Sequence, residues 1–69
     1  MKFIETPESS NVKCIGYENG IIEVHFNNGY VYQYPDCSED LFNSFLTAPS
    51  KGEFVHQVLK PRPIVHRIR

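Results

Sequence analysis

Two Asn-Gly pairs, Asn19-Gly20 and Asn28-Gly29, set narrow limits on the fold, because each lies between segments of alternating apolar and polar residues. Asn-Gly supplies the positive φ angles that tight β-hairpin turns need. The flanking segments, residues 12–17, 21–26 and 30–34, have the length and alternation typical of strands. The sequence therefore predicts a three-stranded antiparallel meander.

Tyrosines dominate the third predicted strand. Side chains two residues apart lie on the same face of a strand, so Tyr30, Tyr32 and Tyr34 are expected to share one face. Each ring is apolar with a hydroxyl at its edge, so the row can form half of a core or a platform for stacking. The large apolar area of the rings favours the core. Whether the tyrosines or Val31 join the core stays open.

The hydrophobic period changes from strand-like to helical after residue 37. Ser38 is expected to cap a first helix that ends at Ala48-Pro49. Ser50 has capping-box spacing to Glu53 and is expected to start a second, shorter helix. The apolar stripes are Leu41, Phe42, Phe45 and Leu46 in the first helix and Phe54, Val55, Val58 and Leu59 in the second.

The two ends of the chain are less well defined by the sequence. Residues 1–8 are expected to be flexible or to dock through Phe3 and Ile4. Prolines after the second helix force an extended path, so residues 60–69 form either a basic tail or an additional edge strand. We expect one α+β domain over residues 1–69: a three-stranded antiparallel meander packed against two short C-terminal helices.

Composition restricts the class of protein. A chain of 69 residues, 41% hydrophobic and 22% charged, has room for one modest core and resembles an ordinary globular domain. It lacks an apolar run of membrane-span length and an N-terminal secretory signal, so no membrane partner is expected. Two cysteines are too few for a disulfide framework, which favours a cytoplasmic location with reduced thiols.

Charge is divided unevenly along the chain. The formal net charge is −1, but residues 1–50 carry two lysines against seven acidic residues. Residues 51–69 carry five basic residues against one glutamate. This division predicts a basic C-terminal edge on an acidic body, or simply a tail kept soluble by its charges.

Catalysis and metal binding have little support in the sequence. Cys14 and Cys37 could in principle pair with a histidine, but no spacing requires it, and a cysteine in a strand is usually buried and inert. The chain has no Cys-x-x-Cys or His-x-x-x-His pair for a metal. We therefore expect a non-enzymatic domain without a cofactor or a metal.

Several short motifs follow one another along the chain in a fixed order. They are Ser9-Ser10-Asn11, Ile15-Gly16-Tyr17, Val24, Phe26, Gly29, Tyr32-Gln33-Tyr34, the segment Ala48-Pro49-Ser50-Lys51-Gly52-Glu53-Phe54 and a proline- and arginine-rich ending. Over residues 9–69 this set resembles the KTSC domain family, found at the C-terminus of some lysyl-tRNA synthetases and as small bacterial or phage proteins. Cys37-Ser38 stands where the family usually has Val-Pro, and Val55-His56 where it has Phe-Asn.

The association of that family with a synthetase implies a role in RNA binding. Single-stranded RNA is often bound by aromatic rings that stack on bases and by cations that hold phosphates. The candidate residues for RNA, another nucleic acid or a nucleotide are Tyr30, Tyr32, Tyr34, Lys51, Lys60, Arg62, Arg67 and Arg69. Lys51 stands out because it opens the second helix beside N–H groups suited to an anion. The plainer alternatives are tyrosines packed in the core and a solvated lysine after a helix cap.

A protein-interaction module is the alternative function. A small sheet can pair its edge with a strand of a partner protein, or bind the partner through its outer face. Salt separates the two hypotheses, because affinity for phosphates falls steeply with salt and affinity at a strand edge changes little.

Overall fold

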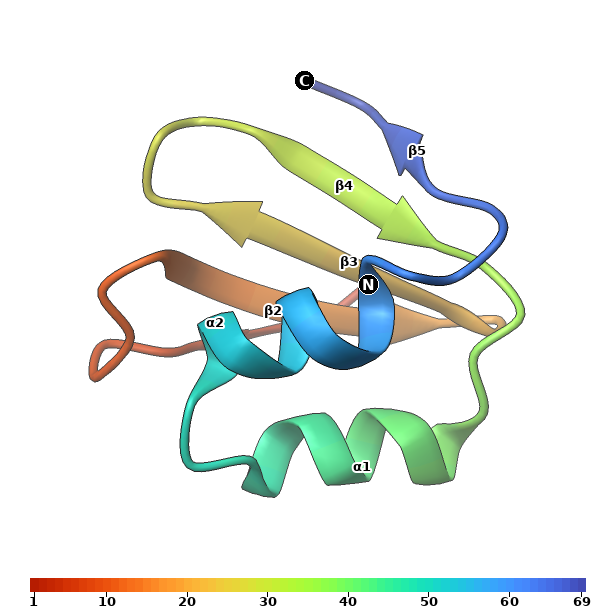
Figure 1. Ribbon diagram of the computed structural model, residues 1–69, viewed down its shortest axis with the longest axis horizontal. Helices are drawn as coiled ribbons and strands as arrows, with labels where there is room; N and C mark the ends of the chain where they lie inside the picture. Colours follow the sequence, from red (N-terminus) through yellow and green to blue (C-terminus); the bar gives the residue numbers. More distant parts are fainter.

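Five antiparallel strands form one sheet whose order in space follows the sequence, β1-β2-β3-β4-β5, in a computed structural model that describes all 69 residues. The strands are β1 (Phe3–Glu5), β2 (Val12–Glu18), β3 (Ile21–Phe26), β4 (Val31–Tyr34) and β5 (His66–Arg67). Helix α1 (Glu39–Thr47) and a second helix, α2 (Lys51–Phe54), lie on one side of the sheet (Figure 1). Helix α2 continues directly into a π-helical turn, η1 (Val55–Leu59). The α+β class is confirmed, but the predicted count of three strands is wrong.

Local signals in the sequence produce the turns and the helix starts. Asn19 and Gly20 have φ angles of 52° and 78°, and Gly29 has a φ of 96°, as tight hairpin turns require. The hydroxyl of Ser38 accepts a hydrogen bond from the Leu41 N–H at 3.0 Å at the start of α1. The hydroxyl of Ser50 accepts one from the Glu53 N–H at 3.3 Å at the start of α2. These elements are confirmed.

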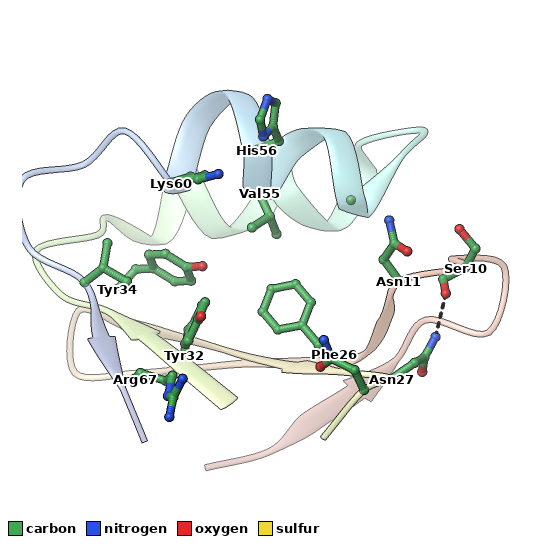
Figure 2. A pocket seen from close by; sticks show the side chains of 13 residues that line it. Ser10, Asn11, Phe26, Asn27, Tyr32, Tyr34, Val55, His56, Lys60 and Arg67 are labelled. Atoms are coloured by element: carbon green, nitrogen blue, oxygen red, sulfur yellow. Dashed lines mark hydrogen bonds between the residues drawn. The ribbon is translucent and has the colours of Figure 1, made fainter. Parts of the chain in front are cut away.

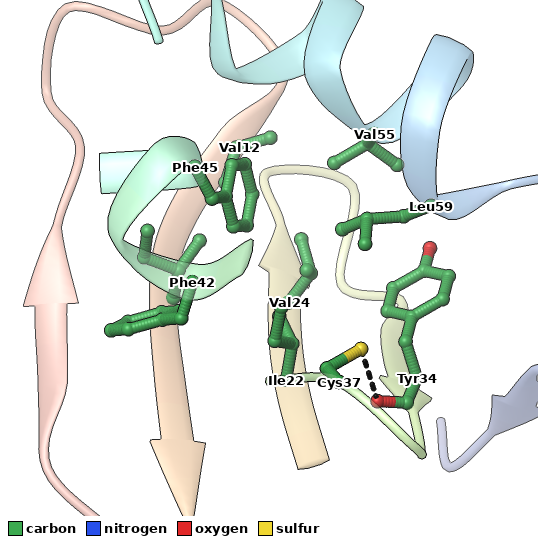
Figure 3. Packing of buried hydrophobic residues seen from close by; sticks show 10 residues of the cluster. Val12, Ile22, Val24, Tyr34, Cys37, Phe42, Phe45, Val55 and Leu59 are labelled. Carbon is green, nitrogen blue, oxygen red and sulfur yellow. Dashed lines mark hydrogen bonds between the residues drawn. The ribbon is translucent and has the colours of Figure 1, made fainter. Parts of the chain in front are cut away.

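The core lies between the helices and the face of the sheet that carries Ile15, Ile22 and Val24, which we call the inner face (Figure 3). Phe45 of α1 and Leu59 of η1 are also fully buried and pack the helices against this face. Burial of each such side chain stabilises the fold by about 1.5–3 kcal/mol. The buried apolar residues are Val12, Ile15, Ile22, Val24, Val31, Tyr34, Cys37, Phe42, Phe45, Val55 and Leu59.

One residue of the predicted second stripe is not in the core. Val58 is 37% exposed, whereas Val55 and Leu59 are buried. The backbone explains the difference, because the N–H of Lys60 bonds to the carbonyl of Val55, five residues earlier, at 2.7 Å. A π-helical turn is wider than an α-helical one, so Val55 and Leu59 face the sheet while Val58 turns away.

Both ends of the chain join the sheet. At the N-terminus the structure has the arrangement in which Phe3 and Ile4 dock on the sheet, since Phe3 of β1 pairs with Gly16 of β2. The alternative of an edge strand near the C-terminus is confirmed, because Arg67 of β5 pairs with Tyr32 of β4. Neither helix has the length and apolar composition that a membrane span requires.

The tyrosines occupy three different environments. Strand β4 begins at Val31, so Tyr30 lies just before it and is 44% exposed. Tyr32 is half-buried, and Tyr34 is only 1% exposed and belongs to the core. Val31 is also buried, but on the other face of the sheet, where it pairs with His25. The strand therefore buries side chains on both faces.

Candidate nucleic-acid interface

A groove of about 780 Å³ opens between the inner face of the sheet and the α2–η1 helix (Figure 2). We call it the inner groove. The end of β3 and strand β4 form its floor, and the α2–η1 helix forms the wall that faces this floor. The loop before β2 lies at one end of the groove and the C-terminal segment at the other. In Figure 2 Tyr32 and Tyr34 lie at one end, with Lys60 above them and Arg67 below them, and the amide side chains lie at the other end, with Phe26 between.

Phe26 and Tyr32 form the aromatic part of the inner groove. Their rings meet edge to face with centroids 5.6 Å apart. Tyr32 also lies between the other two tyrosines, nearly parallel to the ring of Tyr30 and edge-on to that of Tyr34, at 6.4 Å in each case. Burial raises the pKa of Tyr34 to about 12, so its hydroxyl keeps its proton at neutral pH. The floor is therefore a neutral and largely apolar surface with one ring, Tyr32, at its centre.

Lys60 and Arg67 supply the positive charge of the inner groove from two different elements. Lys60 is exposed and follows η1, while Arg67 is exposed on β5 beside Tyr32. The guanidinium of Arg67 lies over the ring of Tyr30, 5.0 Å from its centroid. This cation–π contact holds the cation at the edge of the aromatic floor.

Three of the predicted cations lie elsewhere. Lys51 is 7% exposed and its ammonium donates to the carbonyl oxygen of Ala48 at 2.8 Å. The guanidinium of Arg62 donates to the carbonyl oxygen of Asp36 at 2.6 Å. Arg69 pairs through its backbone carbonyl with the N–H of Val31 and does not line the inner groove. The expectation that Lys51 presents its charge to an anion at the helix start is therefore wrong.

The predicted residues are thus brought together only in part. Tyr32, Tyr34, Lys60 and Arg67 line the inner groove, and Tyr30 contacts Arg67 beside it. The sequence did not single out the remaining polar and aromatic residues of the lining as site residues, chiefly Ser10, Asn11, Phe26, Asn27 and His56.

The amide end of the inner groove is built by two loops that meet. The side chain of Asn27 donates to the carbonyl oxygen of Ser10 at 2.9 Å, and the N–H of Asn27 donates to the carbonyl oxygen of Asn11 at 2.8 Å. Gly52 on the helix makes room for this loop, because a Cβ there would lie 3.1 Å from Nδ2 of Asn11. The sequence contains the motif Ser9-Ser10-Asn11, but it did not predict that this motif lies at the end of the inner groove.

The two thiols are poor candidates for a nucleophile. Burial raises the pKa of Cys14 and that of Cys37 above the ordinary value of 9.0. The thiol of Cys37 lies 3.1 Å from the carbonyl oxygen of Tyr34, to which it donates. Both groups therefore remain protonated at neutral pH, and a protonated thiol is a weak nucleophile.

A separate polar cluster lies on the outer face of the sheet, opposite the helices. The carboxylate of Glu23 lies 2.6 Å from Nε2 of His25 and accepts a hydrogen bond from the amide of Gln33 at 2.7 Å. Phe3 covers the imidazole edge-on, with ring centroids 4.8 Å apart. Burial raises the pKa of Glu23, but the bonds from Gln33 and His25 lower it by more, so it lies below the ordinary 4.5.

Residues 8–62 match the family model of the KTSC domain. This chain belongs to the KTSC domain family. The KTSC domain described here is similar to a protein from Tsukamurella paurometabola and to an uncharacterised protein from Stutzerimonas stutzeri. Each is 35% identical over 57 residues, which cover 80% of this chain and 85% and 80% of those proteins.

A solved structure supports the same assignment. The crystal structure of a KTSC domain protein from Yersinia pestis matches this KTSC domain with a TM-score of 0.86 and 31% sequence identity. The match covers 99% of this chain and 97% of that chain. The resemblance derived from the sequence is thereby confirmed, and it extends to the N-terminal and C-terminal segments.

Proposed function

We propose that this KTSC domain is a non-enzymatic, cytoplasmic binding module that takes up single-stranded RNA in the inner groove. One observation carries the proposal: the groove sets the half-buried ring of Tyr32 between Lys60 on the helix and Arg67 on the sheet, with the ring of Phe26 next to it. Aromatic rings stack on unpaired bases with little dependence on sequence, and cations beside them hold the phosphates.

The shape of the inner groove favours a single strand over a duplex. A volume of about 780 Å³ falls in the range of sites that enclose small ligands. A base can reach Tyr32 only when it is unstacked and turned away from its partner, which loops and ends of RNA allow and a duplex does not. Tyr30 lies beside the groove, in contact with Arg67, and offers the next nucleotide a ring.

The test is a titration of isotopically labelled protein with a short single-stranded RNA and with a duplex of the same sequence. Amide shifts are expected at Phe26, Tyr32, Lys60 and Arg67 with the single strand only. Two phosphate contacts predict that log K falls with log salt with a slope of about −1.4. Absence of shifts at high RNA concentration would show that the proposal is wrong.

A matched pair of variants sharpens this test. Lys60→Ala removes one groove cation and is expected to make the salt slope shallower by about 0.7. Lys13→Ala removes an exposed lysine of β2 that does not line the inner groove, and it is expected to leave the slope unchanged. Equal effects of the two variants would mean that binding depends on overall charge alone.

Protein binding at the sheet edge is a second candidate, because apolar side chains are exposed at both edges. Phe3 and Ile4 of β1 are each more than 40% exposed, and Ile68, just after β5, is 54% exposed. Short edge strands with exposed apolar side chains can accept a strand from a partner. Binding of this kind would change little with salt and would shift the amides of β1 or β5 rather than those of the inner groove.

A further inference from the structure

We infer that the inner groove selects among bases and prefers those with an exocyclic amino group, adenine and cytosine, over uracil. The inference rests on the proposed function and goes further by naming the class of base. The groove is polar at both ends, but the two ends differ in charge, and this difference orients a bound nucleotide.

The end that carries Lys60 and Arg67 attracts phosphate. Both side chains are exposed, and neither forms an ion pair with a carboxylate of the chain, whereas Arg62 and Lys51 are bonded to carbonyl oxygens. A nucleotide whose phosphate lies here and whose base lies against Phe26 and Tyr32 directs the base edge toward the loop that carries Asn11.

That far end carries free hydrogen-bond acceptors beside amides that can also donate. Nδ2 of Asn27 is used in the bond to Ser10, and its Oδ1 has no hydrogen-bond partner within the chain. The side chain of Asn11 has no partner within the chain either, so its amide can both donate and accept. Gly52 leaves this amide its space beside the helix.

A second hollow of about 450 Å³ continues from this end and shares Ser10, Asn11, Gly52 and His56 with the inner groove. Apart from Pro49 and Gly52 its lining is polar or charged, and Glu8 and Glu53 contribute carboxylates. Glu8 is exposed and has no hydrogen-bond partner, whereas Glu53 already accepts a bond from Gln57. The lysine in this lining, Lys51, is bonded to Ala48.

Acceptors and carboxylates favour a ligand edge that donates. Adenine and cytosine carry an amino group where uracil carries a carbonyl oxygen, and carboxylates accept from such amino groups. Uracil would set its own acceptor against the acceptors of Asn27 and Glu8, which costs binding energy because like partial charges meet. The groove thereby discriminates through the base edge and not only through stacking.

The experiment compares hexamers of adenylate, cytidylate and uridylate by fluorescence anisotropy at one salt concentration. The adenylate and cytidylate hexamers are expected to bind roughly five-fold more tightly than the uridylate hexamer, which corresponds to about 1 kcal/mol. Equal affinity, or tighter binding of uridylate, would overturn the inference and leave the proposed function standing. Failure of all three to bind would overturn both.

Variants locate the preference. Glu8→Gln removes a carboxylate without changing its size and is expected to reduce the ratio of affinities to within about two-fold. Asn11→Ala removes an amide that both donates and accepts, so it is expected to weaken binding of all three hexamers to a similar degree. Glu5→Gln removes an exposed carboxylate of β1 that does not line either hollow, and it should leave the ratio unchanged. A ratio that Glu8→Gln does not alter would contradict the inference.

Discussion

The ammonium of Lys51 donates a hydrogen bond to the carbonyl oxygen of Ala48, with Nζ 2.8 Å from the oxygen. Ala48 is the C-terminal cap of α1, where the last carbonyl groups of a helix lack partners within the helix. Lys51, the first residue of α2, therefore supplies a hydrogen-bond donor to the C-terminal end of α1. Lys51 joins the two helices across a turn of the chain, and its burial follows from that role.

Replacement of Lys51 by methionine separates this role from RNA binding. Lys51→Met keeps most of the buried stem but leaves the Ala48 carbonyl without its charged donor, so the free energy of unfolding in urea is expected to fall by about 1–2 kcal/mol. RNA affinity is expected to stay the same. Lys60→Met is the control and should show the reverse, with lower affinity and unchanged stability. A folded Lys51→Met protein with much weaker RNA binding would contradict this assignment.

Local chemistry explains which parts of the fold could be predicted. The Asn-Gly turns and the caps at Ser38 and Ser50 are set by neighbouring residues, and the structure contains all of them. Strand β1 has no such local signal, because three residues give little alternation and their pairing depends on Gly16, which is distant in the sequence. The π-helical turn that exposes Val58 has no clear sequence signal either.

The candidate site was predicted only where its residues are close together in the sequence. Tyr32 and Tyr34 stand in one visible row, whereas Asn11 meets the groove only because the loop before β2 bonds to Asn27 after β3. Counting basic residues located the charge in the C-terminal part but could not show that Arg62 is bonded to a carbonyl of the loop that holds Asp36. Contacts between distant segments decide these points.

Addition of a methyl group at Gly16 tests how β1 is attached. A Cβ there would lie 2.8 Å from Cδ1 of Phe3 and 2.9 Å from the sulfur of Met1, so Gly16→Ala must displace the Phe3 ring from its position on the sheet. Because that ring is largely exposed and can move, the loss of global stability is expected to be about 1 kcal/mol or less. Hydrogen exchange of the β1 amides should nevertheless become much faster.

The double variant Phe3→Ala/Gly16→Ala is the control for this prediction. Without the Phe3 ring most of the clash is gone, so Gly16→Ala should cost less stability in the Phe3→Ala background than in the original sequence. An equal cost in both backgrounds would mean that the clash is not with Phe3.

Alkaline pH is expected to weaken the fold through Tyr34. Burial raises the pKa of Tyr34 from 10.0 to about 12, so between these values the unfolded chain loses a proton that the folded chain keeps. The contribution of Tyr34 to the free energy of unfolding is therefore fully present below pH 10 and is lost as the pH rises toward 12. Tyr34→Phe cannot ionise, so its stability should decline less over this range in urea titrations. Parallel declines of the two proteins would contradict the burial argument.

Acid is expected to weaken the fold through Glu23 on the outer face. Burial raises the pKa of Glu23, but hydrogen bonds from Gln33 and His25 lower the pKa by a larger amount, so the pKa lies below the ordinary 4.5. A carboxyl group whose pKa is lowered by folding stabilises the fold when the pH is above its pKa in the unfolded chain. This contribution disappears as the pH falls through its lower pKa in the folded protein. Glu23→Gln is therefore expected to lower the free energy of unfolding by about 1 kcal/mol at neutral pH and by progressively less in acid, as measured by urea unfolding between neutral pH and pH 3.

Glu5→Gln, at an exposed carboxylate without a hydrogen-bond partner, is the control, and its free energy of unfolding should follow that of the original protein at every pH. If the deficit of Glu23→Gln were the same at every pH, the hydrogen bonds to the ionised carboxylate would not be what stabilises this face of the sheet.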